Sequence, residues 1–173
     1  MNYLLRIIIV IGFVLIGING NAAIINVPDD YSTIQEAINN SINGDTIRVA
    51  PDEYFENINF NGHNVTVASW FIDMGDTSYI SSTIVNGDNS GTVFVFENGE
   101  NNVAHLIGFT IINGSADSGG GIRCVNSSPV ISNNVIKQNY SNRGGGGIYA
   151  ANNSAAIITS NIVKENDCYH SSS

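Results

Sequence analysis

Two stretches of the chain decide the fold: GGGIRCVNSSPVISNNVIKQN at residues 119–139 and GGGIYAANNSAAIITSNIVKEN at residues 145–166. Their triple glycines begin at Gly119 and Gly145, and a matching series of apolar and asparagine residues follows each one. A weaker copy, GFTIING at 108–114, aligns with 133–139 at nearly the same spacing. A fixed period of this length is typical of solenoids, in which each repeat buries its apolar face by stacking on a neighbour.

The apolar residues of the repeat are mainly Ile and Val, with Phe in the earlier strands, and these side chains suit a pleated surface. Leu106 is the only leucine after residue 22, which excludes a leucine-rich repeat of similar period. Short β runs without intervening helices also exclude a doubly wound sheet. The sequence therefore predicts an all-β fold, a parallel β-helix whose successive rounds add strands to shared sheets.

A single helix of about ten residues is predicted before the repeats, because Ser32 and Gln35 form a capping box and Asn43-Gly44 ends the apolar periodicity. Turns are predicted at 51–53 and 61–64, and 70–82 reads as an excursion from the stack without an assigned structure. Short strands are predicted at 24–27, 46–50, 57–60, 65–68, 83–85, 93–96, 103–107 and 109–112.

The repeated glycines and asparagines have structural roles in this prediction. The runs 119–121 and 144–147 are expected to make bends with positive φ, where a side chain would collide with the round beneath. Asn134 with Asn161, and Asn139 with Asn166, recur at turns. Asn tolerates the left-handed conformation, and stacked amides can hydrogen-bond from round to round.

The N-terminal residues 1–22 have the pattern of a secretory signal peptide. Arg6 precedes an apolar run at 7–18, and small residues permit cleavage after Ala22. The run is short for a bilayer span, which needs about 20 apolar residues; an uncleaved anchor is the alternative. The predicted organisation is therefore a signal peptide (1–22), an N-terminal cap with the first round (23–60) and β-helix rounds (61–173), with no transmembrane span in the mature chain.

The charge and the cysteines limit which partners and which disulfides the sequence allows. The formal net charge is −9, and removal of Arg6 leaves 5 basic against 15 acidic residues, which argues against nucleic-acid binding. Cys124 and Cys168 occupy different places in the repeat and are predicted to be free thiols. Six Asn-x-Ser/Thr triplets, read as chance in an Asn- and Ser-rich chain rather than as glycosylation sites, begin at Asn39, Asn64, Asn113, Asn126, Asn139 and Asn152.

The chain resembles the right-handed parallel β-helix repeat proteins of the pectin-lyase-like superfamily over residues 24–166. The segment 25–60 resembles their N-terminal cap, while GFTI at 108–111, the GGGI repeats and SSPVISNN at 127–134 resemble their coils. The resemblance implies a helix that plugs the N-terminal end of the stack. The resemblance says little about activity, because the superfamily includes lyases, hydrolases, esterases and adhesins.

Two features of the sequence bear on activity. EYFENINF at 53–60 and SSTIVNG at 81–87 resemble pectin methylesterases, but that family's Gln-Ala-Val-Ala and Gln-Asp-Thr-Leu signatures are absent, so no catalytic residue is transferred. A further glycine run is expected near residue 172, where the sequence stops, so a fragment of a longer protein is predicted.

Residues that could carry chemistry are scattered. A calcium-dependent lyase needs converging carboxylates with Arg or Lys near the sugar. Each acidic residue here is more simply explained as a solvated turn residue. Lys137 and Lys164 occupy the same repeat position, which suggests a solvent-facing ladder of lysines. The histidines lack metal-ligand spacing, and the glycine runs lack the Lys-Ser/Thr of a phosphate loop. The candidates are the acids Asp73, Asp76, Asp88, Glu97, Glu100 and Asp117, the bases Arg123, Lys137, Arg143 and Lys164, the histidines His63, His105 and His170, and the aromatic cluster Trp70, Phe71 and Tyr79.

The sequence thus predicts an exported cell-surface or extracellular repeat protein that is non-catalytic and serves adhesion or polysaccharide contact. The alternative is the N-terminal fragment of a polysaccharide lyase, hydrolase or esterase. No catalytic or cofactor-binding residue is assigned; Ca²⁺ is the one metal considered, without a ligand set.

Overall fold

The computed structural model describes residues 21–169. Within that range the molecule consists mainly of short β-strands in four parallel sheets, with three short helices. Most of the predicted signal peptide (1–20) and His170 lie outside the described residues. No helix among residues 21–169 combines the length and the apolar character that crossing a bilayer requires.

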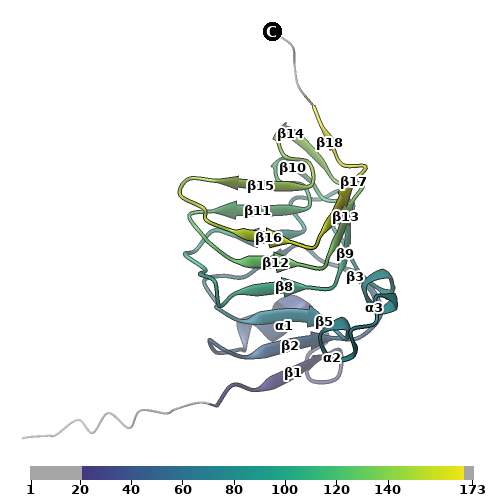
Figure 1. The fold of residues 1–173 in the computed structure, drawn as a ribbon, viewed down its shortest axis with the longest axis vertical. Helices are drawn as coiled ribbons and strands as arrows, with labels where there is room; N and C mark the ends of the chain where they lie inside the picture. The colour runs from purple at the N-terminus through teal and green to yellow at the C-terminus, as the bar shows by residue number, and fades with distance from the viewer. Residues whose placement is uncertain (1–20, 170–173) are drawn as a thin grey trace, which may run out of the picture.

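The strands of each sheet stack one above another along the long axis of the molecule (Figure 1). Sheet A contains β1 (Ile24–Val27), β2 (Thr46–Val49), β5 (Thr66–Ser69), β8 (His105–Ile107), β12 (Val130–Ser132) and β16 (Ile157–Thr159). Sheet B contains β3 (Asp52–Phe55), β6 (Thr83–Asn86), β9 (Thr110–Ile112), β13 (Val135–Lys137) and β17 (Ile162–Lys164). Sheet C contains β4 (Ile58–Asn59), β7 (Phe94–Phe96), β11 (Ile122–Val125) and β15 (Ile148–Ala151), and sheet D contains β10 (Ser115–Ser118), β14 (Tyr140–Gly144) and β18 (Asp167–Cys168).

The chain visits these sheets in a repeating order, and we call one circuit a round. The early rounds run from sheet A to sheet B to sheet C, and from β8 onward sheet D is inserted between sheets B and C. The predicted neighbourhood of the two triple-glycine segments is confirmed, because the Gly121 N–H donates to the Gly146 carbonyl at 2.9 Å. The arrangement is consistent with a solenoid.

The core is a set of apolar columns that run through successive rounds. In sheet A, Val67, Leu106 and Ile131 are all fully buried and are partners in register. Ile158 follows Ile131 in the next round, where nothing among the described residues covers it, and it is 45 % exposed. Burial at one position therefore depends on the round stacked above it, as expected for a one-dimensional array.

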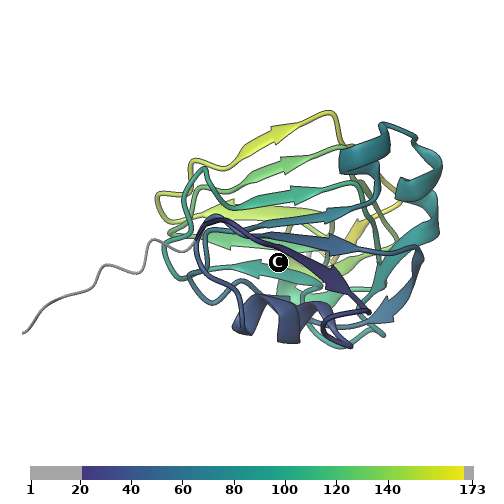
Figure 2. The ribbon, with the colours of Figure 1, turned by 90° about the horizontal axis from the view of Figure 1, so that it is seen from below.

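The helix α1 (Ile34–Asn39) lies across the N-terminal end of the stack, as Figure 2 shows from below. Its buried face joins the core through Ile34, Ala37 and Ile38. The predicted helix is confirmed in place but is shorter than expected, with Thr33 rather than Ser32 as the N-cap. The physical reason is that the Glu56 carboxylate accepts the N–H groups of Ile34 and Gln35, at 2.9 and 3.0 Å, and so fixes the start of the helix.

Two other segments differ from the prediction. The expected turn at 51–53 contains the start of β3, because Asp52 and Glu53 are in register with Thr83 and Ile84 of β6. The unassigned excursion 70–82 contains two further short helices, α2 (Phe71–Met74) and α3 (Ser78–Ser82), which project from the stack in Figure 1.

The stacked asparagines bond as predicted but do not hold the left-handed conformation. The Asn134 side-chain N–H donates to the Asn161 amide oxygen at 3.1 Å. Positive φ is instead found at the residue before each stacked Asn, namely at Asn133, Gln138, Ser160 and Glu165. Within the glycine runs only Gly119 and Gly145 have positive φ. Other glycines of the runs are needed for close approach, since a Cβ on Gly121 would lie 2.5 Å from the Gly147 carbonyl oxygen.

Candidate ligand-binding hollow

A shallow hollow of about 630 Å³ lies beside sheets C and D. It is formed where the turn before β7, the strand β10, the strand β11 and the end of β14 meet. Residues of both charge signs and two hydroxyl side chains face it. The lining comprises Gly91, Thr92, Ala116, Asp117, Ser118, Arg123 and Arg143.

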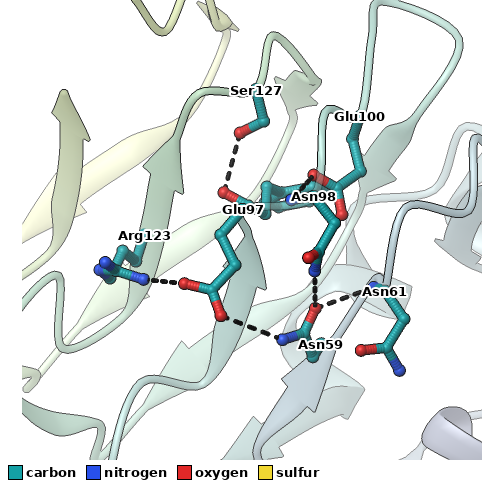
Figure 3. Close-up of polar contacts among 8 residues, drawn as sticks. Asn59, Asn61, Glu97, Asn98, Glu100, Arg123 and Ser127 are labelled. Atoms are coloured by element: carbon teal, nitrogen blue, oxygen red, sulfur yellow. Dashed lines mark hydrogen bonds and ion pairs between the residues drawn. The ribbon is translucent and has the colours of Figure 1, made fainter. Parts of the chain in front are cut away.

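Arg123 is held in the hollow by an ion pair with a neighbouring round. Its guanidinium contacts the Glu97 carboxylate, whose other oxygen accepts the Asn59 amide N–H at 3.4 Å. In Figure 3 the Glu97 carboxylate lies between Arg123 and Asn59. The three residues come from successive strands of sheet C. Asn59 lies in β4, Glu97 directly follows β7, and Arg123 lies in β11. Both partners of the ion pair are about one-third exposed, so the pair orients Arg123 more than it stabilises the fold.

The turn that carries Glu97 is fixed from beneath by Glu100, which is 1 % exposed. The Glu100 carboxylate accepts the N–H groups of Gly62, at 2.9 Å, and Asn98, at 3.0 Å. Ser127 donates its hydroxyl to the Phe96 carbonyl at 2.8 Å, on the other side of the same turn (Figure 3). These contacts hold the turn, and with it the Glu97 partner of Arg123, in one arrangement.

Arg143 is the free cation of the hollow. It is exposed, and none of the ion pairs among residues 21–169 includes it. Asp117, on the strand that pairs with β14, accepts an amide N–H from Asn142 at 3.1 Å instead of facing an arginine in an ion pair. An unpaired guanidinium presents a planar fork of donors that fits a carboxylate or a sulfate oxygen pair.

Tyr149 borders the two arginines. It is the register partner of Arg123 on β15, and a Cβ on Gly144 would lie 3.0 Å from the Tyr149 ring, so the ring lies against the backbone next to Arg143. The ring is half-buried, which leaves a surface on which a ligand could pack. Arg123, Arg143 and Asp117 were among the predicted candidates, but Tyr149, Thr92 and Ser118 were not. The sequence could have indicated Tyr149 by its position, because Tyr149 lies one repeat after Arg123.

The remaining acidic candidates do not converge on the hollow. Asp73 pairs with Arg48 at 3.2 Å, and Asp88 lies in an exposed turn. Asp76 accepts the Ser78 N–H at 2.8 Å, and this bond lowers the pKa of the Asp76 carboxyl. Asp76 and Asp88 take the turn roles that the sequence suggested, whereas Asp73 lies in helix α2 and pairs with Arg48.

The histidine, aromatic and cysteine candidates also lie elsewhere. His63 contacts the Ser41 hydroxyl in a turn, and His105 contacts the Asn102 carbonyl. Trp70 and Tyr79 pack together with ring centroids 5.8 Å apart, on the helical excursion.

Cys124 and Cys168 are free thiols on sheets C and D. Burial, with a smaller effect of the Glu100 charge, raises the pKa of Cys124 to about 12. A thiol with so high a pKa is not a nucleophile at neutral pH.

The hollow offers groups that can bind a polar ligand. Among residues 21–169 no cluster of three or more His, Cys, Asp or Glu side chains could hold a metal ion. The lining offers guanidinium and hydroxyl donors, one carboxylate and an adjacent aromatic ring, without a histidine or a cysteine beside the hydroxyls. Comparison of the chain with protein-family models, with curated proteins and with solved structures gives no match.

Proposed function

We propose that this chain is a right-handed parallel β-helix of the pectin-lyase-like kind, exported to the cell surface or the extracellular space, where it contacts polysaccharide without transforming it. The parallel sheets and the repeating order of strands support the fold. The signal-like residues 1–22 support export. N-terminal sequencing of protein secreted by an expressing cell tests the second point, with Ala23 as the expected first residue.

The observation that carries the proposed contact is the unpaired Arg143 beside Arg123 and Tyr149. A sugar ring packs its C–H face on an aromatic side chain, and a sugar carboxylate matches the guanidinium fork. The ligand class that fits is therefore a polysaccharide with carboxylate-bearing sugars. Long-range repulsion from the net charge of −9 opposes its approach, so the arginines supply a local attraction that the protein surface as a whole does not.

Titration calorimetry with oligosaccharides of uronic acids, beside neutral oligosaccharides of equal length, tests this contact. Arg143→Gln and Tyr149→Ala are each expected to weaken binding of the acidic oligosaccharide at least tenfold. Lys137→Gln is the matched control, because it also removes one positive charge but lies on sheet B. Equal binding by wild type and both hollow variants, or preference for the neutral oligosaccharide, would contradict the proposed contact.

The rival function, part of a polysaccharide lyase, hydrolase or esterase, is tested in the same samples. Each of these activities leaves products: an unsaturated sugar that absorbs ultraviolet light, a new reducing end, or a released acid. The proposed function expects none of them during prolonged incubation with the protein, with or without Ca²⁺. Accumulation of any of these products in proportion to protein concentration would favour the enzyme.

A further inference from the structure

The strand β14 carries a bulge of one residue near its end, where the chain bends from sheet D toward sheet C. On either side of the bulge β14 pairs with β10, which lies beneath it in Figure 1, but the register shifts between Ala116 and Ser118. Two residues of β14, Asn142 and Arg143, therefore stand opposite the single residue Asp117. Bulges redirect side chains and are frequent beside functional sites.

The bulge decides which way Arg143 points. In a regular strand successive side chains face opposite sides of the sheet. Ser141 is fully buried and Asn142 is exposed, so regular alternation would turn the next residue toward the interior. Arg143 is instead exposed as well, and it lines the hollow beside sheets C and D. The extra residue thus places two consecutive side chains on the outside.

The bulge also decides which residue of β14 contacts the Asp117 carboxylate. The Asn142 amide N–H donates to Asp117 at 3.1 Å, and no ion pair among residues 21–169 joins Asp117 to Arg143, although both line the hollow. Without the extra residue, an arginine in the place of Asn142 would stand directly opposite Asp117. Its Cα would lie about 4.8 Å away, where opposite charges on neighbouring strands pair.

The other arginines show that an arginine without a carboxylate partner is the exception in this protein. Arg48 pairs with Asp73 at 3.2 Å, and Arg123 pairs with Glu97. Of the three arginines among residues 21–169, Arg143 alone has no such partner, although a carboxylate lines the same hollow. The spacing imposed by the bulge accounts for this difference.

We propose that the bulge at Asn142 and Arg143 keeps the Arg143 guanidinium apart from Asp117 and so leaves it available to a ligand carboxylate. Asn142 is a positioning residue, because it occupies the place opposite Asp117 and gives that carboxylate a neutral partner. An internal ion pair would compete with the ligand and lower its apparent affinity. The inference rests on the proposed contact with acidic polysaccharide and adds the feature that keeps its main cation free.

Deletion of Asn142 tests the spacing without a ligand, because it places Arg143 opposite Asp117. Phenylglyoxal modifies guanidinium groups, and an ion pair slows the reaction since it stabilises the protonated form. Peptide mapping by mass spectrometry should show that Arg143 reacts faster than Arg48 and Arg123 in wild type. The deletion should slow Arg143 by about threefold, as expected for an exposed ion pair, and Asp117→Asn in the same chain should restore the rate.

Titration calorimetry with the uronic-acid oligosaccharide tests the consequence for binding. Deletion of Asn142 should weaken binding by about threefold or more, although Arg143 is still present. Asp117→Asn should strengthen binding more in the deletion variant than in wild type, because only there does the carboxylate compete for Arg143. A purely structural effect of the deletion would not depend on the charge of Asp117.

Circular dichroism establishes that each variant is folded. Asn142→Ala keeps the length of the strand and removes only the amide contact with Asp117, so it carries the test if the deletion variant does not fold, with a smaller loss of Arg143 reactivity expected. The inference is overturned if Arg143 reacts equally fast in wild type and both Asn142 variants, or if Asp117→Asn has the same effect in every background. If the reactivity changes as expected but wild type binds no acidic oligosaccharide, the polysaccharide contact fails and the spacing role of the bulge stands.

Discussion

A single side chain, that of Asn139, joins three rounds of the chain. Its amide nitrogen donates to the carbonyl oxygens of Ile111 and Lys137 and to the Asn166 side chain, at 3.0, 2.9 and 2.9 Å. Its amide oxygen accepts the Gly114 N–H at 2.8 Å. Every polar atom of this buried amide is therefore satisfied by backbone or by an equivalent residue, which is the condition for burying it at low cost.

Replacing Asn139 by Ala should destabilise the fold more than replacing an exposed asparagine. The change leaves several buried backbone groups without partners, and we expect the free energy of unfolding to fall by about 2–4 kcal/mol. Asn142→Ala is the control, because Asn142 is exposed and makes one bond, to Asp117. Urea denaturation measures both variants, and equal losses would contradict the importance of the asparagine column.

The Cys124 thiol should make stability decrease at alkaline pH. Its pKa rises from 9.0 to about 12 on folding, so only the unfolded chain ionises between these values. Its contribution is therefore fully present below pH 9 and is lost as pH rises, by up to about 1.4 kcal/mol per pH unit. The effect of Tyr54, whose pKa is raised from 10.0 to about 12 by burial and then by Asp52, has the same sign but begins one pH unit higher.

The window between pH 9 and pH 10 isolates the thiol. Denaturation across this window should show a shallower decline for Cys124→Ala than for wild type. Ser141→Ala, which removes a buried hydroxyl and no ionisable group, should decline in parallel with wild type. Parallel lines for all three proteins would show that Cys124 ionises as readily in the folded state as in the unfolded state.

At the scale of elements, α1 shows what local sequence can and cannot predict. The apolar spacing of Ile34, Ala37 and Ile38 indicated the helix and its buried face. The carboxylate that caps its N-terminus belongs to Glu56, 22 residues away, and no local rule points to it. The start of β3 was missed for a similar reason, because Pro51-Asp52-Glu53 has turn chemistry and only pairing with β6 makes it a strand.

Glu56 should stabilise the start of α1 as an N-cap residue does. Glu56→Ala removes both acceptors, and we expect a loss of about 1–2 kcal/mol in the free energy of unfolding, with Glu56→Gln in between. Asp88→Asn is the control, because it neutralises an exposed turn carboxylate and keeps a residue that tolerates positive φ. If Glu56→Ala and Asp88→Asn lose equal stability, the carboxylate does not act as the cap.

At the scale of the whole molecule, stability is distributed along the stack. Ile131 and Ile158 are the same residue type at the same position of successive rounds, yet Ile131 is fully buried and Ile158 is 45 % exposed. We expect Ile131→Ala to lower the free energy of unfolding by about 2–5 kcal/mol and Ile158→Ala by about 1 kcal/mol. Thermal or urea denaturation of the pair measures this difference, and equal losses would contradict the dependence on the covering round.

The same stacking explains how far the sequence predicted the candidate site. The period of the repeat placed the glycine runs, the asparagine columns and the Lys137–Lys164 pair correctly, since each depends on one repeat lying on the next. The hollow depends on the size of the bend between sheets B and C, where sheet D is inserted, and on a contact between Glu97 and Arg123 that do not occupy equivalent positions. Neither follows from periodicity.

The in-register columns have a consequence for how this gene can vary in length. Duplication or loss of one full circuit, such as the stretch from Gly119 to Gly144, would return every side chain to the column it left, whatever the point at which the unit was copied. A single inserted residue within a strand would instead exchange the interior and exterior side chains of that strand beyond the insertion. The length of such a protein should therefore change by whole rounds during evolution, and smaller insertions should be tolerated at the bends.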